Sequence, residues 1–330
     1  MKKIKRYASF LATLLTFSLG SISLSHAVSV SDFPVLQKLV KQMSEEDGYP
    51  AKELIDVLSR AKIDQKTLEL MDRQYESLPW HKYRKLFIND RRINDGVEFW
   101  EKNTAILDQV TEKFGVPQQI LVALLGVETH YGKRIGDKSV LNSLVTLSAA
   151  FPRRSKYFTK ELRVFLKTTR EEKIDPSTVL GSFAGAIGIP QFMPSSYRAY
   201  SIDFNGNGRR DLVNEYEDAI GSVANYLHVH GWTRGQAIYA DVSNSLPEEA
   251  KELVTRRAKP KLSSAQLIGS GVNYDNRGGS NKAALLKLKE SDRNRYIVGF
   301  RNLYAITRYN PSVNYAMAIV ELSQEISERR

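Results

Sequence analysis

The chain has 330 residues, 42% of them hydrophobic and 26% charged, which is the composition of a globular protein with one large or two to three small domains. It contains no cysteine, which excludes disulfides, thiol catalysis, cysteine-ligated zinc and a lipid anchor on an N-terminal cysteine. The formal net charge of +11 favours polyanions, although a solvated surface explains the scattered basic residues equally well. Since no zinc finger, RNP motif or basic heptad helix occurs, we expect no nucleic acid partner.

The first 27 residues have the pattern of a secretory signal peptide. Four basic residues within positions 2–6 precede an apolar run over residues 7–24, and the tripeptide SHA at 25–27 places small residues where signal peptidase accepts them. Serine and glycine interrupt the run, which favours cleavage over retention as a membrane anchor. We expect a soluble mature product that begins after Ala27.

Residues 28–103 show mostly helical periodicity. Asp32 is the expected N-cap of a first helix with apolar residues at three- and four-residue spacing up to Met43, and residues 51–61 form a second amphipathic helix. Residues 75–87 mix aromatic with basic side chains and predict a loop or an extended stretch. Residues 96–110 predict one further helix.

The middle of the chain contains an almost wholly apolar helix. Pro117 suits its first turn, and Gly132 is its expected C-terminal cap. Further helices are predicted over residues 141–149, 155–172 and 217–230.

The sequence pattern changes from helical to extended after Trp232. Short extended pieces at residues 237–242 and 296–300 lie among turns rich in glycine, serine and asparagine, and they predict a small β-containing lobe. The chain closes with a predicted helix over residues 315–326.

The heptapeptide GVETHYG at residues 126–132 places Glu128 at the end of the apolar helix. A carboxyl group among leucine, valine and alanine loses hydration, and its pKa rises because the charged form is penalised. A general acid that works near neutral pH needs such a raised pKa. A surface glutamate at a helix end explains the heptapeptide alone equally well, so a second motif has to decide.

That second motif is GSFAGAIGIPQFMPSSY at residues 181–197. Its glycines, prolines and small residues let the backbone approach a ligand closely. Ser182 and Gln191 offer hydrogen bonds, and the aromatic residues offer flat surfaces for sugar rings. A tight turn between helices would explain the glycines but not the polar and aromatic interleaving.

Together with AAFPRRSKYF at residues 149–158, these motifs closely resemble the membrane-bound lytic transglycosylase B family and its soluble forms. The resemblance continues through DAIGSVANYL (218–227), NLYAITRYN (302–310) and YAMA (315–318). It implies an α+β, predominantly helical fold with a lysozyme-like catalytic core. The implied segments are a signal peptide (1–27), a helical domain (28–103), the core with a calcium-type loop (104–234), a small β-containing lobe (235–310) and a C-terminal helix that packs back on the body (311–330).

The resemblance also implies a function. Enzymes of this family cleave the β-1,4 bond between MurNAc and GlcNAc in peptidoglycan and leave 1,6-anhydromuramoyl ends, with one carboxyl group as acid and base where most glycosidases need two. No cofactor is required for catalysis. The expected partners are peptidoglycan glycan strands, without nucleic acid or lipid anchor, and the expected protein is a periplasmic monomer.

The family's catalytic glutamate lies in the motif matched by Glu128. Arg153 and Arg154 suit lactyl or peptide carboxylates, unless they are solvated surface charges, and Ser182 would position the N-acetyl group or Glu128. The implied substrate-groove residues are Arg153, Arg154, Tyr157, Ser182, Gln191, Tyr226, Tyr304, Tyr309, Asn310 and, in a less firmly aligned segment, Tyr83.

The sequence DFNGNGR at residues 203–209 has the first seven positions of an EF-hand, with oxygen ligands at positions one, three and five and glycine at six. The predicted structural calcium site comprises Asp203, Asn205, Asn207, the backbone carbonyl of Arg209 and, as the resemblance implies, Asp218. Asn214 at position twelve departs from the usual glutamate. Asparagine at positions three and five predicts weak binding, and an Asn/Gly turn without metal is the alternative.

Two other functions compete with the transglycosylase. A hydrolytic muramidase would have to activate water, usually with a second carboxylate, and residues 181–197 contain no acidic residue. A non-catalytic peptidoglycan-binding protein would keep the groove without turnover, but the intact motif around Glu128 argues against it.

Overall fold

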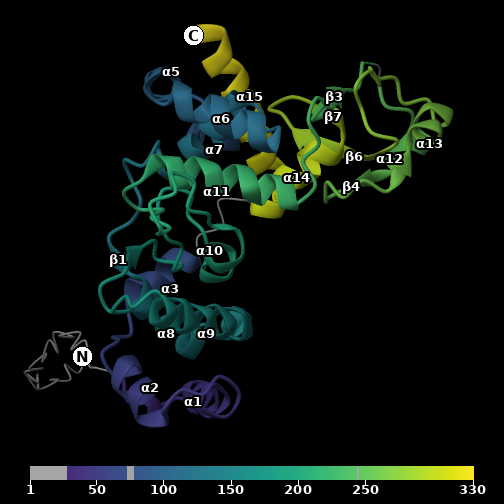
Figure 1. The fold of residues 1–330 in the computed structure, drawn as a ribbon. Helices are drawn as coiled ribbons and strands as arrows, with labels where there is room; N and C mark the ends of the chain where they lie inside the picture. The colour runs from purple at the N-terminus through teal and green to yellow at the C-terminus, as the bar shows by residue number, and fades with distance from the viewer. Residues whose placement is uncertain (1–27, 73–77, 244) are drawn as a thin grey trace, which may run out of the picture.

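The computed structural model describes residues 28–72, 78–243 and 245–330. The signal peptide predicted for residues 1–27 lies outside the described residues, as does part of the stretch 75–87. Helices predominate, and a small sheet forms a lobe at one side, so the expected α+β, predominantly helical class is confirmed (Figure 1). None of the helices in the described ranges has the length and apolarity needed to cross a lipid bilayer.

The first helices pack against a helical hairpin from the middle of the chain. α1 buries an apolar stripe that contains Leu36 and Met43, and it contacts both hairpin helices, α8 and α9 (Figure 1). Asp47, just after α1, accepts hydrogen bonds at 2.7 Å from Arg163 Nε and Lys167 Nζ of α9, which hold its pKa down at about 2. The elements of this part are η1 Val30–Asp32, α1 Pro34–Glu46, α2 Ala51–Leu58, α3 Gln65–Met71, α8 Val140–Ala150, η4 Pro152–Arg154 and α9 Ser155–Glu171.

Three expectations for the first hundred residues are wrong. Asp32 lies within η1, and α1 instead begins at Pro34, where a missing N–H costs nothing. Residues 80–86 are helical rather than extended, as α4 (Trp80–Tyr83) and η3 (Arg84–Leu86). The helix predicted over residues 96–110 is two helices, divided at Asn103, whose side chain donates to the last turn of the first.

The apolar helix, α7, is buried along most of its length. It packs against α5, α6, α11 and the long C-terminal α15, which places the end of the chain beside its middle (Figure 1). The helices of this part are α5 Asp90–Lys102, α6 Thr104–Phe114, α7 Gln118–Thr129, α11 Tyr216–Val229, α14 Arg301–Tyr309 and α15 Val313–Arg329.

A loop-rich stretch leads from α9, the second hairpin helix, to α11. A two-residue antiparallel pair, β1 (Lys138–Ser139) with β2 (Leu180–Gly181), opens it, and α10 (Pro194–Tyr200) closes it against α9.

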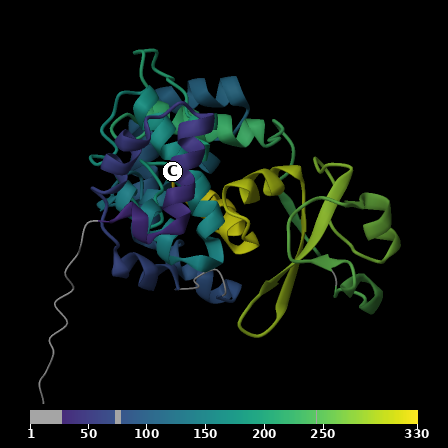
Figure 2. The same cartoon turned by 90° about the horizontal axis from the view of Figure 1, so that it is seen from below.

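The β lobe stands at the side of the helical body, and α14 and α15 lie between the two in the view from below (Figure 2). Its sheet order is β3-β7-β6-β4, with β5 on β6 and only β4 parallel to its neighbour. Alternation along β6 and β7 buries Leu285 and Val298 in the lobe's own core. The elements are β3 Tyr239–Asp241, α12 Glu248–Lys251, β4 Val254–Thr255, β5 Leu262–Ser263, α13 Ser264–Gly269, β6 Lys282–Lys289 and β7 Asn294–Gly299.

Candidate active site

Glu128 lies in the last turn of α7, among side chains that are almost all buried. Glu128 is itself a partly exposed residue, unlike its neighbours on the same helix turn. Tyr315 Oη, on the first turn of α15, donates a hydrogen bond to Glu128 Oε1. Burial raises the pKa of Glu128 to about 7, against the opposing effect of the Tyr315 hydrogen bond, which favours the carboxylate. The group can therefore be protonated or ionised near neutral pH.

α7 ends in a strained turn. His130 and Tyr131 both adopt left-handed backbone angles, with φ of 53° and 60°, which non-glycine residues rarely do. The C-cap is His130, so the predicted Gly132 cap is wrong. The turn is held in place from α5, because the His130 ring pairs with Asp95.

Gly126 makes room for this turn. A Cβ at position 126 would lie 2.6 Å from Tyr131 Oη, which donates to Arg92 O at 2.8 Å. On the other side of the helix end, Thr129 Oγ1 donates to Ile189 O at 2.8 Å and ties α7 to the loop that precedes α10. The end of the helix that carries Glu128 is thus fixed from two directions.

Three tyrosines, Tyr315, Tyr309 and Tyr226, form a row that leads away from Glu128, and we call them the tyrosine row. The Tyr309 ring centroid lies 6.5 Å from that of Tyr315 and 4.8 Å from that of Tyr226. The Phe192 ring centroid lies 5.6 Å from those of Tyr226 and Tyr309. Burial raises the pKa of all three phenols, so they stay neutral hydrogen-bond donors.

Ser182 and Gln191 shape the loop between β2 and α10. Ser182 Oγ accepts a hydrogen bond from Ala186 N at 3.0 Å. Gln191 has a left-handed φ of 52°, and its Nε2 donates to Ile135 O at 3.0 Å and to Gly188 O at 2.9 Å. Both side chains thus hold backbone segments that surround the site.

Arg153, Arg154 and Tyr157 come from η4 and the start of α9. Arg153 pairs with Asp72, and the Arg154 guanidinium lies 4.5 Å from the Tyr157 ring centroid. Burial raises the pKa of Tyr226, and Tyr157 raises it further through space, so Tyr157 lies toward the tyrosine row. The exposed Arg–Tyr stack is a flat, cationic surface.

The remaining implied groove residues flank the tyrosine row. Tyr83 is a buried residue of α4, and α4 contacts α15. The pKa of Tyr315 is raised first by its own burial and also by groups around it, one of which is Tyr83. The guanidinium groups of Arg301 and Arg308, also on α14, lie 5.9 and 6.0 Å from the Tyr304 ring centroid. Asn310 Oδ1 accepts from Ser312 N at 3.1 Å and shapes the turn before α15. Tyr315 itself is missing from the predicted site, although the motif YAMA contains it.

The predicted calcium loop lies between α10 and α11. The Asp203 carboxylate accepts backbone N–H bonds from Gly206, Asn207 and Gly208 at 2.7, 3.1 and 2.7 Å. Gly208 stands at position six with φ of 89°, a left-handed angle that glycine adopts without strain. The backbone is therefore curled around Asp203 as an EF-hand curls around its first ligand.

The loop side chains converge on Glu215, which the sequence analysis missed. Its carboxylate accepts from Asn205 Nδ2 at 2.8 Å, from Asn207 Nδ2 at 3.0 Å and from Arg209 Nη2 at 2.6 Å. Asp218 is fully buried, and its two oxygens accept two backbone N–H groups of the loop. No cluster of three or more His, Cys, Asp or Glu side chains suited to a metal occurs in the described ranges, but the mixed carboxylate and amide oxygens fit calcium.

Comparison with known proteins decides the family. The protein-family model described as "Transglycosylase SLT domain" matches residues 32–324 of this chain. The chain belongs to the SLT transglycosylase family. A membrane-bound lytic murein transglycosylase B of Escherichia coli (strain K12) is 38% identical over 308 residues, which cover 90% of this chain and 84% of that protein. The chain is also similar to the solved structure of the E. coli lytic transglycosylase Slt35 in complex with calcium, with a TM-score of 0.82 and 37% identity. The match covers 94% of this chain and 98% of Slt35.

A third match is SltB3 from Pseudomonas aeruginosa in complex with NAG-NAM-pentapeptide, with a TM-score of 0.75, 28% identity and coverage of 91% of this chain and 80% of SltB3. The fold of this SLT transglycosylase is lysozyme-like, as the resemblance implied. The chain is a lytic transglycosylase, a lyase that needs no cofactor for catalysis.

Proposed function

We propose that Glu128 is the single acid and base with which this protein cleaves the MurNAc–GlcNAc bond and forms a 1,6-anhydromuramoyl end. The observation that supports it is the Glu128 carboxyl group, whose pKa burial raises to about 7 beside the tyrosine row, on a residue that keeps partial exposure. The complex of SltB3 with NAG-NAM-pentapeptide supports the same substrate class for this chain.

One carboxyl group can serve both steps. Protonated Glu128 donates its proton to the glycosidic oxygen as the bond to C1 of MurNAc breaks. The resulting carboxylate then takes the proton of the muramic acid 6-hydroxyl, whose oxygen bonds to C1. Tyr315 occupies Oε1, which leaves Oε2 for both transfers.

A hydrolase of the retaining type would need a second carboxylate about 5 Å away. Such a neighbour would raise the pKa of Glu128 by charge repulsion. Within the described residues, burial and the Tyr315 hydrogen bond are the influences that act on that pKa. The site therefore argues against a retaining hydrolase and is compatible with intramolecular attack by the sugar hydroxyl.

The surrounding residues would bind the glycan strand. Tyr157, which is exposed, and Tyr309, which is partly exposed, would offer ring faces to the sugars, as aromatic side chains do in carbohydrate sites, while the buried Tyr226 and Tyr315 would support them from behind. Arg153 and Arg154 would pair with lactyl or peptide carboxylates. Ser182 and Gln191 would keep the loop before α10 in the shape that admits the strand, and Tyr83, Tyr304 and Asn310 would line its ends.

Digestion of purified sacculi, followed by mass spectrometry of the muropeptides, tests the mechanism. We expect the mature protein to release anhydro products, lighter than reducing-end products by one water molecule, and Glu128→Gln to release none. Reducing ends would identify a muramidase instead. Binding to sacculi without release by the unaltered protein would identify a non-catalytic binding protein.

The proposed place of action is the periplasm, since murein transglycosylases act on peptidoglycan there and residues 1–27 have the pattern of a cleaved signal. A signal-processed N-terminus at Val28, read by mass spectrometry of the exported protein, tests this. A mature protein that keeps residues 1–27 would contradict it.

The complex of Slt35 with calcium supports a structural calcium ion in this chain, for which we propose the loop at residues 203–209. Asp203, Asn205, Asn207 and the Arg209 carbonyl would bind it, and Asp218 or Glu215 would close the site. When bound, the ion would cross-link the loop electrostatically. We expect millimolar calcium to raise the melting temperature by a few degrees (of order 1 kcal/mol) over EDTA. Loss of the rise in Glu215→Gln but not in Asp218→Asn would identify Glu215 as the closing ligand, and no rise in the unaltered protein would contradict the site.

A further inference from the structure

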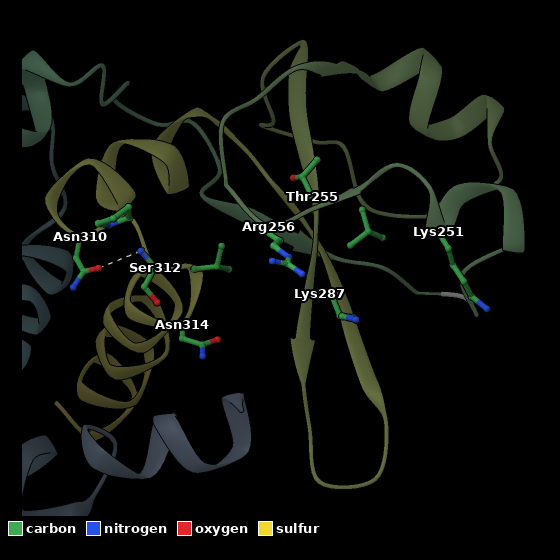
Figure 3. A pocket seen from close by; sticks show the side chains of 10 residues that line it. Lys251, Thr255, Arg256, Lys287, Asn310, Ser312 and Asn314 are labelled. Atoms are coloured by element: carbon green, nitrogen blue, oxygen red, sulfur yellow. Dashed lines mark hydrogen bonds between the residues drawn. The ribbon is translucent and has the colours of Figure 1, made fainter. Parts of the chain in front are cut away.

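A cavity of about 650 Å³ lies where the β lobe meets the start of α15. One wall comes from β4, β6 and the neighbouring loop, and the other from the turn between α14 and α15 (Figure 3). Its volume suits a small ligand or part of a larger one. None of the implied groove residues lies on the β strands, so the β-lobe wall has no role in the proposed function.

The β-lobe wall is cationic. Lys251, Arg256 and Lys287 line it, and no acidic side chain lines the cavity. Lys251 pairs with Glu248 at 2.5 Å, outside the lining. Across the described ranges, no ion pair or hydrogen bond engages the Arg256 or Lys287 side chain, and both residues are exposed (Figure 3). Two unneutralised cations on one wall favour an anionic ligand.

The opposite wall adds hydrogen-bonding groups and helix polarity. Asn310, Ser312 and Asn314 line it, across from Arg256 in Figure 3. Ser312 is the N-cap of the seventeen-residue α15, whose N-terminal end carries partial positive charge. The same carboxylate could therefore meet a guanidinium on one side and a helix start on the other.

This wall also continues into the active site. Tyr309 precedes it directly, and Tyr315 follows Ser312 by three residues, roughly 5 Å along the helix axis. Both tyrosines belong to the tyrosine row, and Tyr315 donates to Glu128. A ligand in the cavity thus sits against the segment that borders the catalytic carboxyl group.

We propose that this cationic cavity binds free carboxylates of the stem peptide carried by the glycan strand next to the bond that is cut. This proposal rests on the proposed function and adds a preference for glycan strands whose stem peptides carry free carboxylates. The stem is joined to the muramic acid lactyl group, and two or three extended residues reach about 7–10 Å, enough to pass from a sugar in the groove to a neighbouring cavity. Arginine and lysine facing open space recognise such carboxylates by charge-assisted hydrogen bonds.

The test compares glycan strands whose stem carboxylates are free with the same strands after conversion of those carboxylates to amides. We expect the unaltered protein to show about a tenfold lower KM for the free form, as one good charged contact provides, with similar kcat. Arg256→Gln/Lys287→Gln should abolish this preference. The matched control is Arg257→Gln/Lys289→Gln, which removes two exposed cations of the same lobe that do not line the cavity and should keep the preference.

Equal KM values for both strands in the unaltered protein, or an unchanged preference in Arg256→Gln/Lys287→Gln, would overturn the proposal. A second measurement is independent of turnover: titration of the Glu128→Gln protein with a free stem tetrapeptide, with and without the cavity substitutions. Binding that the cavity substitutions weaken about tenfold supports the cavity even if no anhydro product forms and the proposed function fails. Turnover with cavity-independent tetrapeptide binding would leave the proposed function standing and remove the cavity's role.

Discussion

The catalytic carboxyl group shows two opposing physical effects on one residue. Burial at the end of α7 disfavours the ionised form of Glu128, and the Tyr315 hydroxyl stabilises it. Burial alone would raise the pKa of Glu128 further and make it a weaker proton donor. The hydrogen bond returns its pKa toward the working range in which the group can give and then retake a proton.

Tyr315→Phe should move the pH dependence of kcat/KM. Removing the donor takes away a stabiliser of the carboxylate, so the pKa of Glu128 rises above about 7 and the alkaline fall in activity shifts upward, by roughly one pH unit. Tyr226→Phe is the control, because that hydroxyl donates to Arg308 O instead. A pH profile of Tyr315→Phe with an unmoved alkaline limb would contradict the role assigned to this hydrogen bond.

Glu128→Gln should stabilise the fold as pH rises. Because the folded pKa, about 7, exceeds the ordinary 4.5, the folded state binds more protons between these values, and its stability falls as pH increases through that window. A neutral amide escapes the loss, so the variant should gain up to about 3 kcal/mol at pH 8 and little at pH 4.5. Urea unfolding at several pH values measures this. Glu69→Gln, at an exposed position of α3, should show no comparable pH-dependent gain.

The sequence could indicate Glu128 but not Tyr315. An acidic residue in an apolar helix is a local pattern that physical reasoning can interpret. Tyr315 lies 187 residues further along the chain, and its contact with Glu128 exists only because α15 packs on α7. Glu215 was missed for a related reason: one residue beyond the standard EF-hand length, it reaches the loop side chains only through the observed curl of the backbone.

At the scale of helices and strands, the contact between α9 and α10 depends on a buried charge. Glu161 is 2% exposed, and its carboxylate accepts from Ser195 N and Ser195 Oγ, each at 2.8 Å, in the first turn of α10. A carboxylate at a helix start is favoured by the unpaired N–H groups there. Because α10 closes the loop that contains Ser182 and Gln191, this contact also fixes the loop.

Glu161→Ala should cost about 3 kcal/mol of unfolding free energy, because it removes two charge-assisted hydrogen bonds and leaves a buried N–H unpaired. Glu171→Ala is a matched control on the same helix, since its ion pair with Arg198 of α10 is exposed and should be worth less than about 1 kcal/mol. Chemical unfolding measures both. Equal losses in the two variants would show that burial of Glu161 is not decisive.

Prediction of helices from the sequence succeeded where the apolar pattern was long, and it failed for a short helix and at helix boundaries. The apolar α7 and the amphipathic α9 follow their sequence patterns closely. The short α4 was missed because a single helical turn is stabilised by burial of Trp80 and Tyr83 rather than by local propensity. The break at Asn103 was missed because the apolar stripe continues across it, and only packing on different neighbours shows the division.

At the scale of the molecule, the question is what holds the β lobe to the helical body. Asn302 in α14 is fully buried. Its side-chain amide accepts a hydrogen bond from Thr233 N and donates to the carbonyl oxygens of Thr233 and Gln236, which lie in the segment that leads from α11 to β3. Glu321 of α15 binds Arg84 of η3 at 3.0 Å and Arg295 of β7 at 2.7 Å. Such long-range polar contacts determine the lobe's position, which composition and local patterns do not encode.

Glu321→Ala should loosen the β lobe more than it damages the helical body. It leaves two partly buried guanidinium groups without their shared carboxylate, whose side chain is 11% exposed, and should cost about 3 kcal/mol. Hydrogen exchange should speed up in β6 and β7 while α7 keeps its protection. Asp241→Ala removes the other carboxylate on Arg295, but that side chain is 52% exposed, so the expected loss is below about 1 kcal/mol. Faster exchange spread evenly over α7 and the β lobe in Glu321→Ala would mean that lobe and body unfold as one unit, and that Glu321 does not hold the lobe in particular.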